Sequence, residues 1–127
     1  MLPLPNLKNG KNQLSFDQYI ISSFDHQQLH QCLDELPKVK RGALIEGIPL
    51  DYAACCDALQ AYSFNTHLSF LSPELLDDAR KRGVQNWVYT VNNPDDWQRM
   101  INWGVDAVFT DKPDALLEFL KSSRATH

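Results

Sequence analysis

The sequence predicts an α/β fold built on a parallel sheet, and three observations lead to this prediction. Short runs of β-branched and aromatic residues alternate five times with amphipathic stretches along the 127 residues. Most of the amphipathic stretches begin with a residue that can cap a helix. No long linker interrupts the alternation. Successive strands are therefore expected to lie parallel and to be joined by right-handed crossovers.

Two architectures share this pattern. A five-stranded doubly wound sheet fits the length, whereas a complete (β/α)8 barrel needs about 200 to 250 residues. A part of such a barrel has the same pattern. Pattern and length alone favour the doubly wound sheet, so the residues at the strand ends must decide between the two.

The first two units follow the region before Gln18. A strand is predicted over Gln18–Phe24, and Asp25 is expected to cap a helix that Pro37 ends. The second unit combines a strand over Ala43–Glu46 with a short helix that we expect Asp51 to cap. Both helices carry apolar residues at a spacing of three and four, which predicts one buried face each.

The third unit begins with a brief apolar stretch. We expect a strand over Tyr62–Phe64, ending at Asn65. Ser72-Pro73-Glu74 then predicts a helix start, because it offers a capping hydroxyl, a proline in the first turn and an acid near the helix amino end. Lys81-Arg82-Gly83 is typical of the end of that helix.

The last two units repeat the same arrangement. Trp87–Val91 is the clearest strand, and Asn93 is expected to cap the helix that Gly104 closes. A final strand is predicted over Ala107–Phe109, and the last helix is expected to begin at a cap near Asp111. The five units therefore occupy nearly the whole chain.

The domain limits follow from the pattern. Residues 18–121 carry the five units and are expected to form one domain. Residues 1–17 hold two prolines and no continuous apolar run, which predicts an irregular segment and no signal peptide. Residues 122–127 are expected to be a frayed tail.

Composition restricts the compartment and the partners. The net charge of -4 argues against a dedicated nucleic-acid-binding protein, because phosphate contacts supply most of that affinity. No apolar run approaches the roughly 18 residues of a membrane helix. Three cysteines without a C-x-x-C spacing argue against a disulfide framework or a zinc ribbon. We therefore expect a cytoplasmic protein with no nucleic-acid or membrane partner.

Polar residues stand at the carboxyl ends of the predicted strands, where ligands bind in both architectures. Helix capping explains three of them, namely Asp25, Asn93 and Asp111. Three others have weaker capping explanations and are candidates for a binding pocket: Ser23, Glu46 and Asn92.

Aromatic and histidine residues add further candidates. Trp87 and Tyr89 share one face of their strand because side chains alternate, and Tyr89 is nearer the carboxyl end. His26 and His30 have a spacing that suits a metal, but they flank the apolar face of their helix and lack a third ligand. We expect both to be solvated. His67 follows a strand end and is within reach of the same edge.

Three motifs occur in register along the chain: Ile20-Ile21-Ser22-Ser23-Phe24-Asp25, Tyr89-Thr90-Val91-Asn92, and Gly104-Val105-Asp106 followed by Val108-Phe109-Thr110-Asp111-Lys112-Pro113. Together they resemble the glycerophosphodiester phosphodiesterase family from about Gln18 to Leu120. That family usually has tryptophan in place of Tyr89, a change that keeps an aromatic wall.

The resemblance implies the carboxyl-terminal half of a TIM (β/α)8 barrel. It further implies hydrolysis of glycerophosphodiesters to an alcohol and sn-glycerol 3-phosphate with a divalent cation, Mg²⁺ or Ca²⁺. Phe24 and Tyr89 would line the glycerol or alcohol side of the pocket, and Ser23, Asn92 or Glu46 would contact the substrate.

The catalytic motifs of the family have no counterparts in this sequence. Its His-Arg-Gly, Glu-x-Asp, His-Asp and Glu-x-Lys motifs precede the Ser-Ser-Phe strand, whereas residues 1–17 contain no histidine, glutamate or arginine. We therefore expect no catalytic or metal-binding residue in this chain, and no activity of the chain alone.

An open parallel sheet also exposes two edges. We expect the chain to form a homo-oligomer or to pair with an amino-terminal half. The alternative hypothesis is a non-catalytic module that binds a glycerophosphate or another protein.

Overall fold

The computed structural model describes residues 18–125, with side chains through residue 122, and contains one five-stranded parallel sheet. The order of the strands across the sheet is β1-β2-β3-β4-β5, the same as their order in the chain. Their bounds are β1 (Ile20–Ser23), β2 (Lys40–Ile45), β3 (Ser63–His67), β4 (Gln85–Tyr89) and β5 (Ala107–Val108). The predicted segment 1–17 lies outside the described residues.

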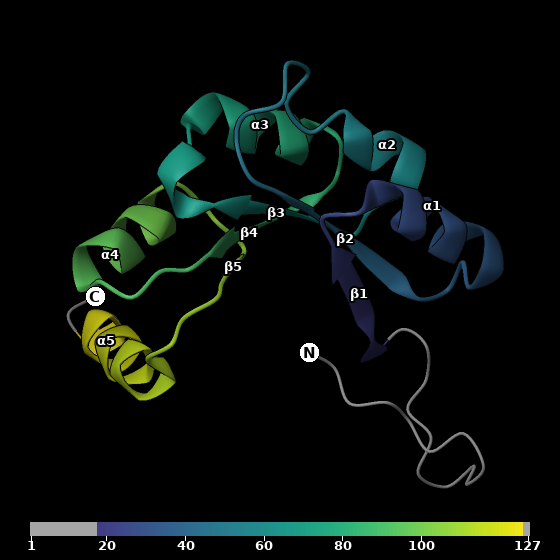
Figure 1. The fold of residues 1–127 in the computed structure, drawn as a ribbon. Coiled ribbons are helices and arrows are strands. Elements are labelled where there is room, and N and C mark those ends of the chain that lie inside the picture. Colours follow the sequence, from purple (N-terminus) through teal and green to yellow (C-terminus); the bar gives the residue numbers. More distant parts are fainter. Residues whose placement is uncertain (1–17, 126–127) are drawn as a thin grey trace, which may run out of the picture.

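The helices all lie on one side of the sheet, along the outside of its curve (Figure 1). Their bounds are α1 (His26–Glu35), α2 (Cys55–Leu59), the 3-10 turn η2 (Leu68–Phe70), α3 (Pro73–Lys81), α4 (Pro94–Asn102) and α5 (Pro113–Ala125). A doubly wound sheet reverses its strand order once and carries helices on both faces. The doubly wound alternative is therefore wrong, and the sheet is part of a (β/α)8 barrel.

The helix starts follow the predicted capping residues in three cases. Asp25 accepts a hydrogen bond from the backbone N–H of Gln28, and Ser72 accepts one from that of Leu75. Asn93 accepts one from the backbone N–H of Asp95. These caps satisfy N–H groups that have no partner within the helix, which explains why the chain turns into a helix directly after each strand.

Several boundaries differ from the sequence prediction, among them those of β1, which occupies Ile20–Ser23 instead of Gln18–Phe24. β2 begins at Lys40, three residues before the predicted start, because Lys40 pairs with Ile20 of β1. The guanidinium of Arg41 is buried and donates to the backbone carbonyls of Leu59 and Gln60 at 2.8 and 3.1 Å. β3 continues through His67, beyond the predicted end at Asn65, and β4 begins at Gln85 instead of Trp87. These three extensions contain polar residues, which an apolar pattern does not reveal.

Helix ends differ from the prediction as well. Asp51 does not cap α2, since residues 51–54 form turns and Ala54 occupies the capping position without a side-chain hydrogen bond. α5 continues to Ala125, so residues 122–125 of the predicted tail are helical. No glycine or proline after Pro113 ends this helix earlier.

The core lies between the sheet and the helices. Ala43 and Phe64 point to the helix side and are fully buried with Leu29 and Leu75. A second cluster joins Val88 and Val91 of the fourth unit to Trp97 and Met100 of α4. These apolar contacts use only one face of the sheet. We call the opposite face, on the inside of the curve, the concave face.

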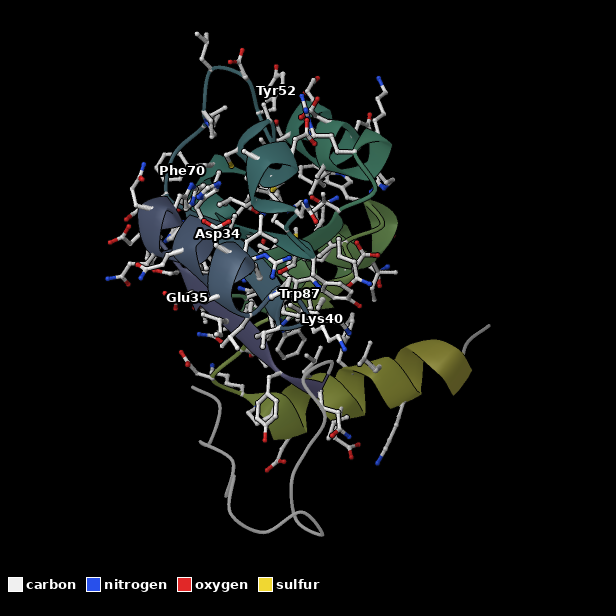
Figure 2. The ribbon with its side chains drawn as sticks, turned by 90° about the vertical axis from the view of Figure 1, so that its right-hand side faces the viewer. Asp34, Glu35, Lys40, Tyr52, Phe70 and Trp87 are labelled. Atoms are coloured by element: carbon white, nitrogen blue, oxygen red, sulfur yellow. The ribbon has the colours of Figure 1, made fainter. Side chains whose placement is uncertain are left out.

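The concave face carries aromatic and polar side chains. Near the amino ends of the strands the ammonium of Lys40 lies 4.4 Å from the ring centre of Tyr62, which packs edge-on against Trp87 at 6.0 Å. Lys40 and Trp87 therefore both contact Tyr62, and Figure 2 shows Phe70 well apart from them. Trp87 in turn packs against Phe109 at 6.0 Å. One aromatic layer therefore crosses the sheet from β3 to β5.

Candidate functional site

Four side chains from consecutive strand ends form one group, which we call the strand-end cluster: Phe24, Glu46, His67 and Tyr89. The parallel register places His67 opposite Tyr89 at the carboxyl ends of β3 and β4. The ring of Tyr89 packs edge-on against Phe24 at 6.2 Å and against His67 at 5.3 Å. The cluster forms because side chains at the carboxyl ends of parallel strands meet at one edge.

Tyr89 holds the cluster together. Its hydroxyl donates a hydrogen bond to the backbone carbonyl of Ile45, 2.6 Å away and 44 residues earlier in the chain. Burial raises the pKa of the phenol, and the nearby carboxylate of Glu46 raises it further. Tyr89 is therefore uncharged, and its ring is held in place because its hydroxyl is already hydrogen-bonded to the backbone.

A pocket of about 450 Å³ opens beside this cluster at the ends of β1 and β2. Its lining joins predicted and unpredicted residues: Phe24, His26, Leu44, Ile45, Glu46, Gly47, Ile48 and Pro49. Phe24 is 57% exposed, so its ring is available to a ligand. Glu46 is exposed as well, and it is the carboxylate among the lining residues.

His26 lines the pocket, although the sequence suggested a solvated helix histidine. Its Nε2 lies 3.0 Å from the carbonyl oxygen of Leu44, which ties the first turn of α1 to β2. That expectation is wrong for His26. His30 is exposed and lies 3.8 Å from Asp34, so it takes no part in the pocket. One signal in the sequence pointed to the pocket: His26 directly follows Asp25, the helix cap that stands at the carboxyl end of β1.

Ser23 and Asn92, two other predicted site residues, are engaged within the protein. Ser23 accepts a hydrogen bond from the backbone N–H of Asp25 at 2.9 Å. Asn92 Oδ1 accepts from the Thr110 hydroxyl and from the backbone N–H of Asp111, at 2.9 and 2.8 Å. Asn92 therefore fixes the loop after β4 against the loop after β5.

Asp111 is not the helix cap that the sequence suggested. Its Oδ2 accepts a hydrogen bond from the Nδ2 of Asn92 at 3.1 Å. The backbone N–H of the next residue, Lys112, donates to the hydroxyl of Thr110 at 3.1 Å. Side chains from two loops thus form one hydrogen-bond network at the carboxyl ends of β4 and β5, and the carboxylate of Asp111 takes part in it.

Among residues 18–122, no three His, Cys, Asp or Glu side chains come close enough to hold a metal ion. A divalent cation such as Mg²⁺ or Ca²⁺ takes several oxygen ligands, usually including carboxylates. Glu46 and Asp111 are carboxylates on different loops of this edge, and the second is bonded to Asn92. The described residues do not fit such a cation by themselves.

The comparisons with known proteins agree on one family. The family model described as "Glycerophosphoryl diester phosphodiesterase family" matches residues 7–115. The chain therefore belongs to this family of phosphodiesterases, as its strand-end motifs suggested. A glycerophosphodiester phosphodiesterase of Caldanaerobacter subterraneus is 31% identical over 105 residues, and one of Bacillus subtilis is 33% identical over 104 residues.

Solved structures give the same fold. A phosphodiesterase of Oleispira antarctica, in complex with the product sn-glycerol-3-phosphate, matches 80% of this chain with a TM-score of 0.75 and 24% identity. A glycerophosphodiester phosphodiesterase of Parabacteroides distasonis matches 81% of the chain with a TM-score of 0.70 and 25% identity.

The chain spans less than half the length of these relatives. It covers 43% of the Caldanaerobacter protein and 34% of the Bacillus protein. It covers 41% of the Oleispira chain and 43% of the Parabacteroides chain. The match is thus to part of a barrel, in agreement with the five strands of the sheet. Within residues 18–125, no helix is both long and apolar enough to cross a membrane.

Proposed function

We propose that this chain supplies the substrate wall, the aromatic side of the substrate pocket, in a glycerophosphodiester phosphodiesterase. Such an enzyme of lipid and glycerol metabolism releases an alcohol and sn-glycerol 3-phosphate. The observation that carries the proposal is the edge-on pair of Phe24 and Tyr89, 6.2 Å apart, at the carboxyl ends of β1 and β4 in a chain of this family. The Oleispira relative was solved with sn-glycerol-3-phosphate as its product, which supports this substrate class.

The aromatic pair would contact the carbon chain of the glycerol or of the leaving alcohol. Both rings offer apolar surface, and the hydroxyl of Tyr89 is already bonded to Ile45. Glu46 stands at the pocket rim, where it would accept a hydrogen bond from a substrate hydroxyl. Ser23 and Asn92 would act by holding the loops after β1 and β4, because their oxygens accept backbone hydrogen bonds.

The chemistry requires groups that the described residues do not bring together. Hydrolysis of a phosphodiester needs stabilisation of negative charge on phosphorus-bound oxygens and a proton for the departing alkoxide. A divalent cation would supply the first when its ligands come from elsewhere in the completed enzyme. We therefore propose that the chain alone is inactive, and that an amino-terminal half or a second copy completes it.

The test is release of sn-glycerol 3-phosphate from a glycerophosphodiester with Mg²⁺ or Ca²⁺ present. The chain alone should give no release, and the chain mixed with an amino-terminal half of a relative should give turnover. Phe24→Ala in the active mixture should raise KM by about 10-fold, the loss expected for one aromatic contact. Exposed Leu117→Ala on α5 is the control and should leave KM unchanged. Turnover by the chain alone would contradict the proposal.

A non-catalytic glycerophosphate-binding module is the second candidate. The pocket beside Phe24 and Glu46 is formed by this chain alone, which supports this candidate. Titration with sn-glycerol 3-phosphate, followed by Trp87 fluorescence, distinguishes the two, because a sensor would bind saturably without any completing half.

The free thiols of Cys32, Cys55 and Cys56 support a reducing compartment, and we propose the cytoplasm.

A further inference from the structure

The loop between β2 and α2 exposes large apolar side chains. We call residues 46–54 the β2–α2 loop; it follows the carboxyl end of β2 and projects past the helices that flank it (Figure 1). Leu50 is 95% exposed, and Ile48 and Tyr52 are exposed as well. Figure 2 shows Tyr52 at the top of the molecule, well apart from Lys40 and Trp87. Exposed apolar side chains that gather on one segment mark a candidate binding surface.

Hydrogen bonds hold the β2–α2 loop in this shape. The backbone N–H of Tyr52 donates to the carbonyl three residues earlier at 3.1 Å, so the chain turns with Leu50 and Asp51 at the tip. The backbone N–H of Ala53 donates to Oδ2 of Asp78 on α3 at 2.9 Å. Tyr52 also has a φ of 52°, a left-handed conformation that a tyrosine rarely adopts. The apolar tip is therefore fixed before a partner binds, and binding does not have to order it.

The charges around the tip restrict the kind of partner. No lysine or arginine occurs between Arg41 and Arg80, so the loop and the segments on both sides of it carry no fixed positive charge. The charged residues of the loop are Glu46 and Asp51, and both are exposed. Their carboxylates are repelled by an anionic lipid surface and attracted by the ammonium groups of zwitterionic lipids such as phosphatidylcholine.

A second copy of the chain fits the loop less well than a lipid surface does. Two copies that met through this loop would bring Glu46 and Asp51 of one copy toward the same carboxylates of the other. A stable protein interface also buries about 800 Å² on each partner, which is more than the apolar side chains of one loop tip offer. A lipid surface requires only a few apolar side chains at its interface.

We infer that the β2–α2 loop docks the chain onto a zwitterionic lipid surface. Ile48 and Leu50 enter the boundary between head groups and acyl chains, and Tyr52 lies at the head-group level, where tyrosine is enriched. The carboxylates of Glu46 and Asp51 stay among the head-group ammonium groups, so the contact is shallow. Ile48 also lines the pocket, and docking therefore brings the pocket next to the lipid surface.

This inference departs from the sequence-based expectation of no membrane partner. That expectation rested on the lack of an apolar run long enough to span a bilayer, whereas contact with a lipid surface needs no such run. The inference goes beyond the proposed function and does not depend on it, because its test requires no turnover.

The experiment measures co-sedimentation of the whole 127-residue chain with phosphatidylcholine vesicles. The chain should bind, and replacing part of the phosphatidylcholine by anionic phosphatidylglycerol should weaken binding at low salt. Leu50→Ser should lower the partition coefficient about 5- to 10-fold, because one large apolar side chain no longer contacts the interface. Leu117→Ser makes the same change at an exposed site on α5 and should leave the partition coefficient unchanged.

Further variants locate the contact and test its charge. The fluorescence of Leu50→Trp, compared with that of the parent chain, should shift to shorter wavelength when vesicles are added, and brominated lipid should quench it. Leu117→Trp should show neither effect. Asp51→Lys reverses the charge at the tip and should remove the preference for phosphatidylcholine over phosphatidylglycerol.

Four results would overturn the inference. The first is a chain that does not bind phosphatidylcholine vesicles. The second is equal weakening by Leu50→Ser and Leu117→Ser, because the contact would then lie elsewhere on the molecule. The third is tighter binding of the parent chain to phosphatidylglycerol. The fourth is a dimer of the parent chain that Leu50→Ser dissociates, because the loop would then be a protein interface.

Discussion

Replacing Gly42 with alanine tests the packing of the concave face. Gly42 lies in β2, where a Cβ would approach the hydroxyl oxygens of Ser22 and Ser63 to 2.8 and 2.9 Å. Both distances are below van der Waals contact, so side chains must shift. Overpacking of this kind costs about 1–3 kcal/mol. The loss of glycine flexibility in the unfolded chain offsets about 0.4–1 kcal/mol.

The net expectation is that Gly42→Ala lowers the free energy of unfolding by about 0.5–2 kcal/mol. Urea unfolding followed by circular dichroism at 222 nm measures this change. With a slope of about 1–2 kcal/mol per molar urea, the midpoint should fall by roughly 0.3–2 M. The slope itself should not change, because the variant alters packing and not the extent of folding.

A double variant identifies the cause. Ser22→Ala removes the closer hydroxyl at an exposed site and should be nearly neutral alone, yet it should restore part of the stability lost in Gly42→Ala. Equal losses in the single and double variants would refute the proposed contact with Ser22. An alanine variant as stable as the parent would refute the crowding of this face altogether.

Three further predictions concern groups whose partners the structure identifies. Tyr89→Phe removes the hydrogen bond to Ile45 and should lower stability by about 0.5–1.5 kcal/mol in urea unfolding. Because the pKa of Tyr89 is raised, its contribution is present below pH about 10 and is lost as pH rises through the folded pKa, which absorbance at 295 nm can follow. Arg41→Met leaves several buried carbonyls without a donor and should cost about 3 kcal/mol or more, whereas an unchanged midpoint would refute the assigned bonds. Iodoacetamide should modify Cys55 before Cys56, and the rate of modification of Cys55 should have its midpoint near pH 7. Hydrogen bonding from Cys56 lowers the pKa of Cys55 to about 7, against the opposing effect of burial, whereas the pKa of buried Cys56 is raised.

Local signals predicted most of the fold. The alternation of strands and helices, and the caps at Asp25, Ser72 and Asn93, depend on neighbouring residues and were readable from the sequence. The choice between a doubly wound sheet and a barrel depends on which strands pair. Periodicity contains no information on pairing, so the motifs at the strand ends had to decide it.

The site was predictable only in part, because several of its residues act through distant partners. The aromatic pair of Phe24 and Tyr89 followed from motif and strand position. The hydrogen bond from Tyr89 to Ile45 joins residues that are 44 positions apart in the chain. The hydrogen bond from Asn92 to Asp111 joins residues that are 19 positions apart. No local sequence pattern indicates either contact. Asp111 was expected to cap a helix, but the amide of Asn92 competes for its carboxylate.

The most direct test of the central claim is a chimera. The segment of the Caldanaerobacter protein that matches this chain over 105 residues is replaced by the corresponding residues of this chain, and release of sn-glycerol 3-phosphate is measured with Mg²⁺ or Ca²⁺. If this chain is the substrate wall of such an enzyme, the chimera hydrolyses glycerophosphodiesters and Phe24→Ala raises its KM. A folded chimera that hydrolyses none of them would contradict the account.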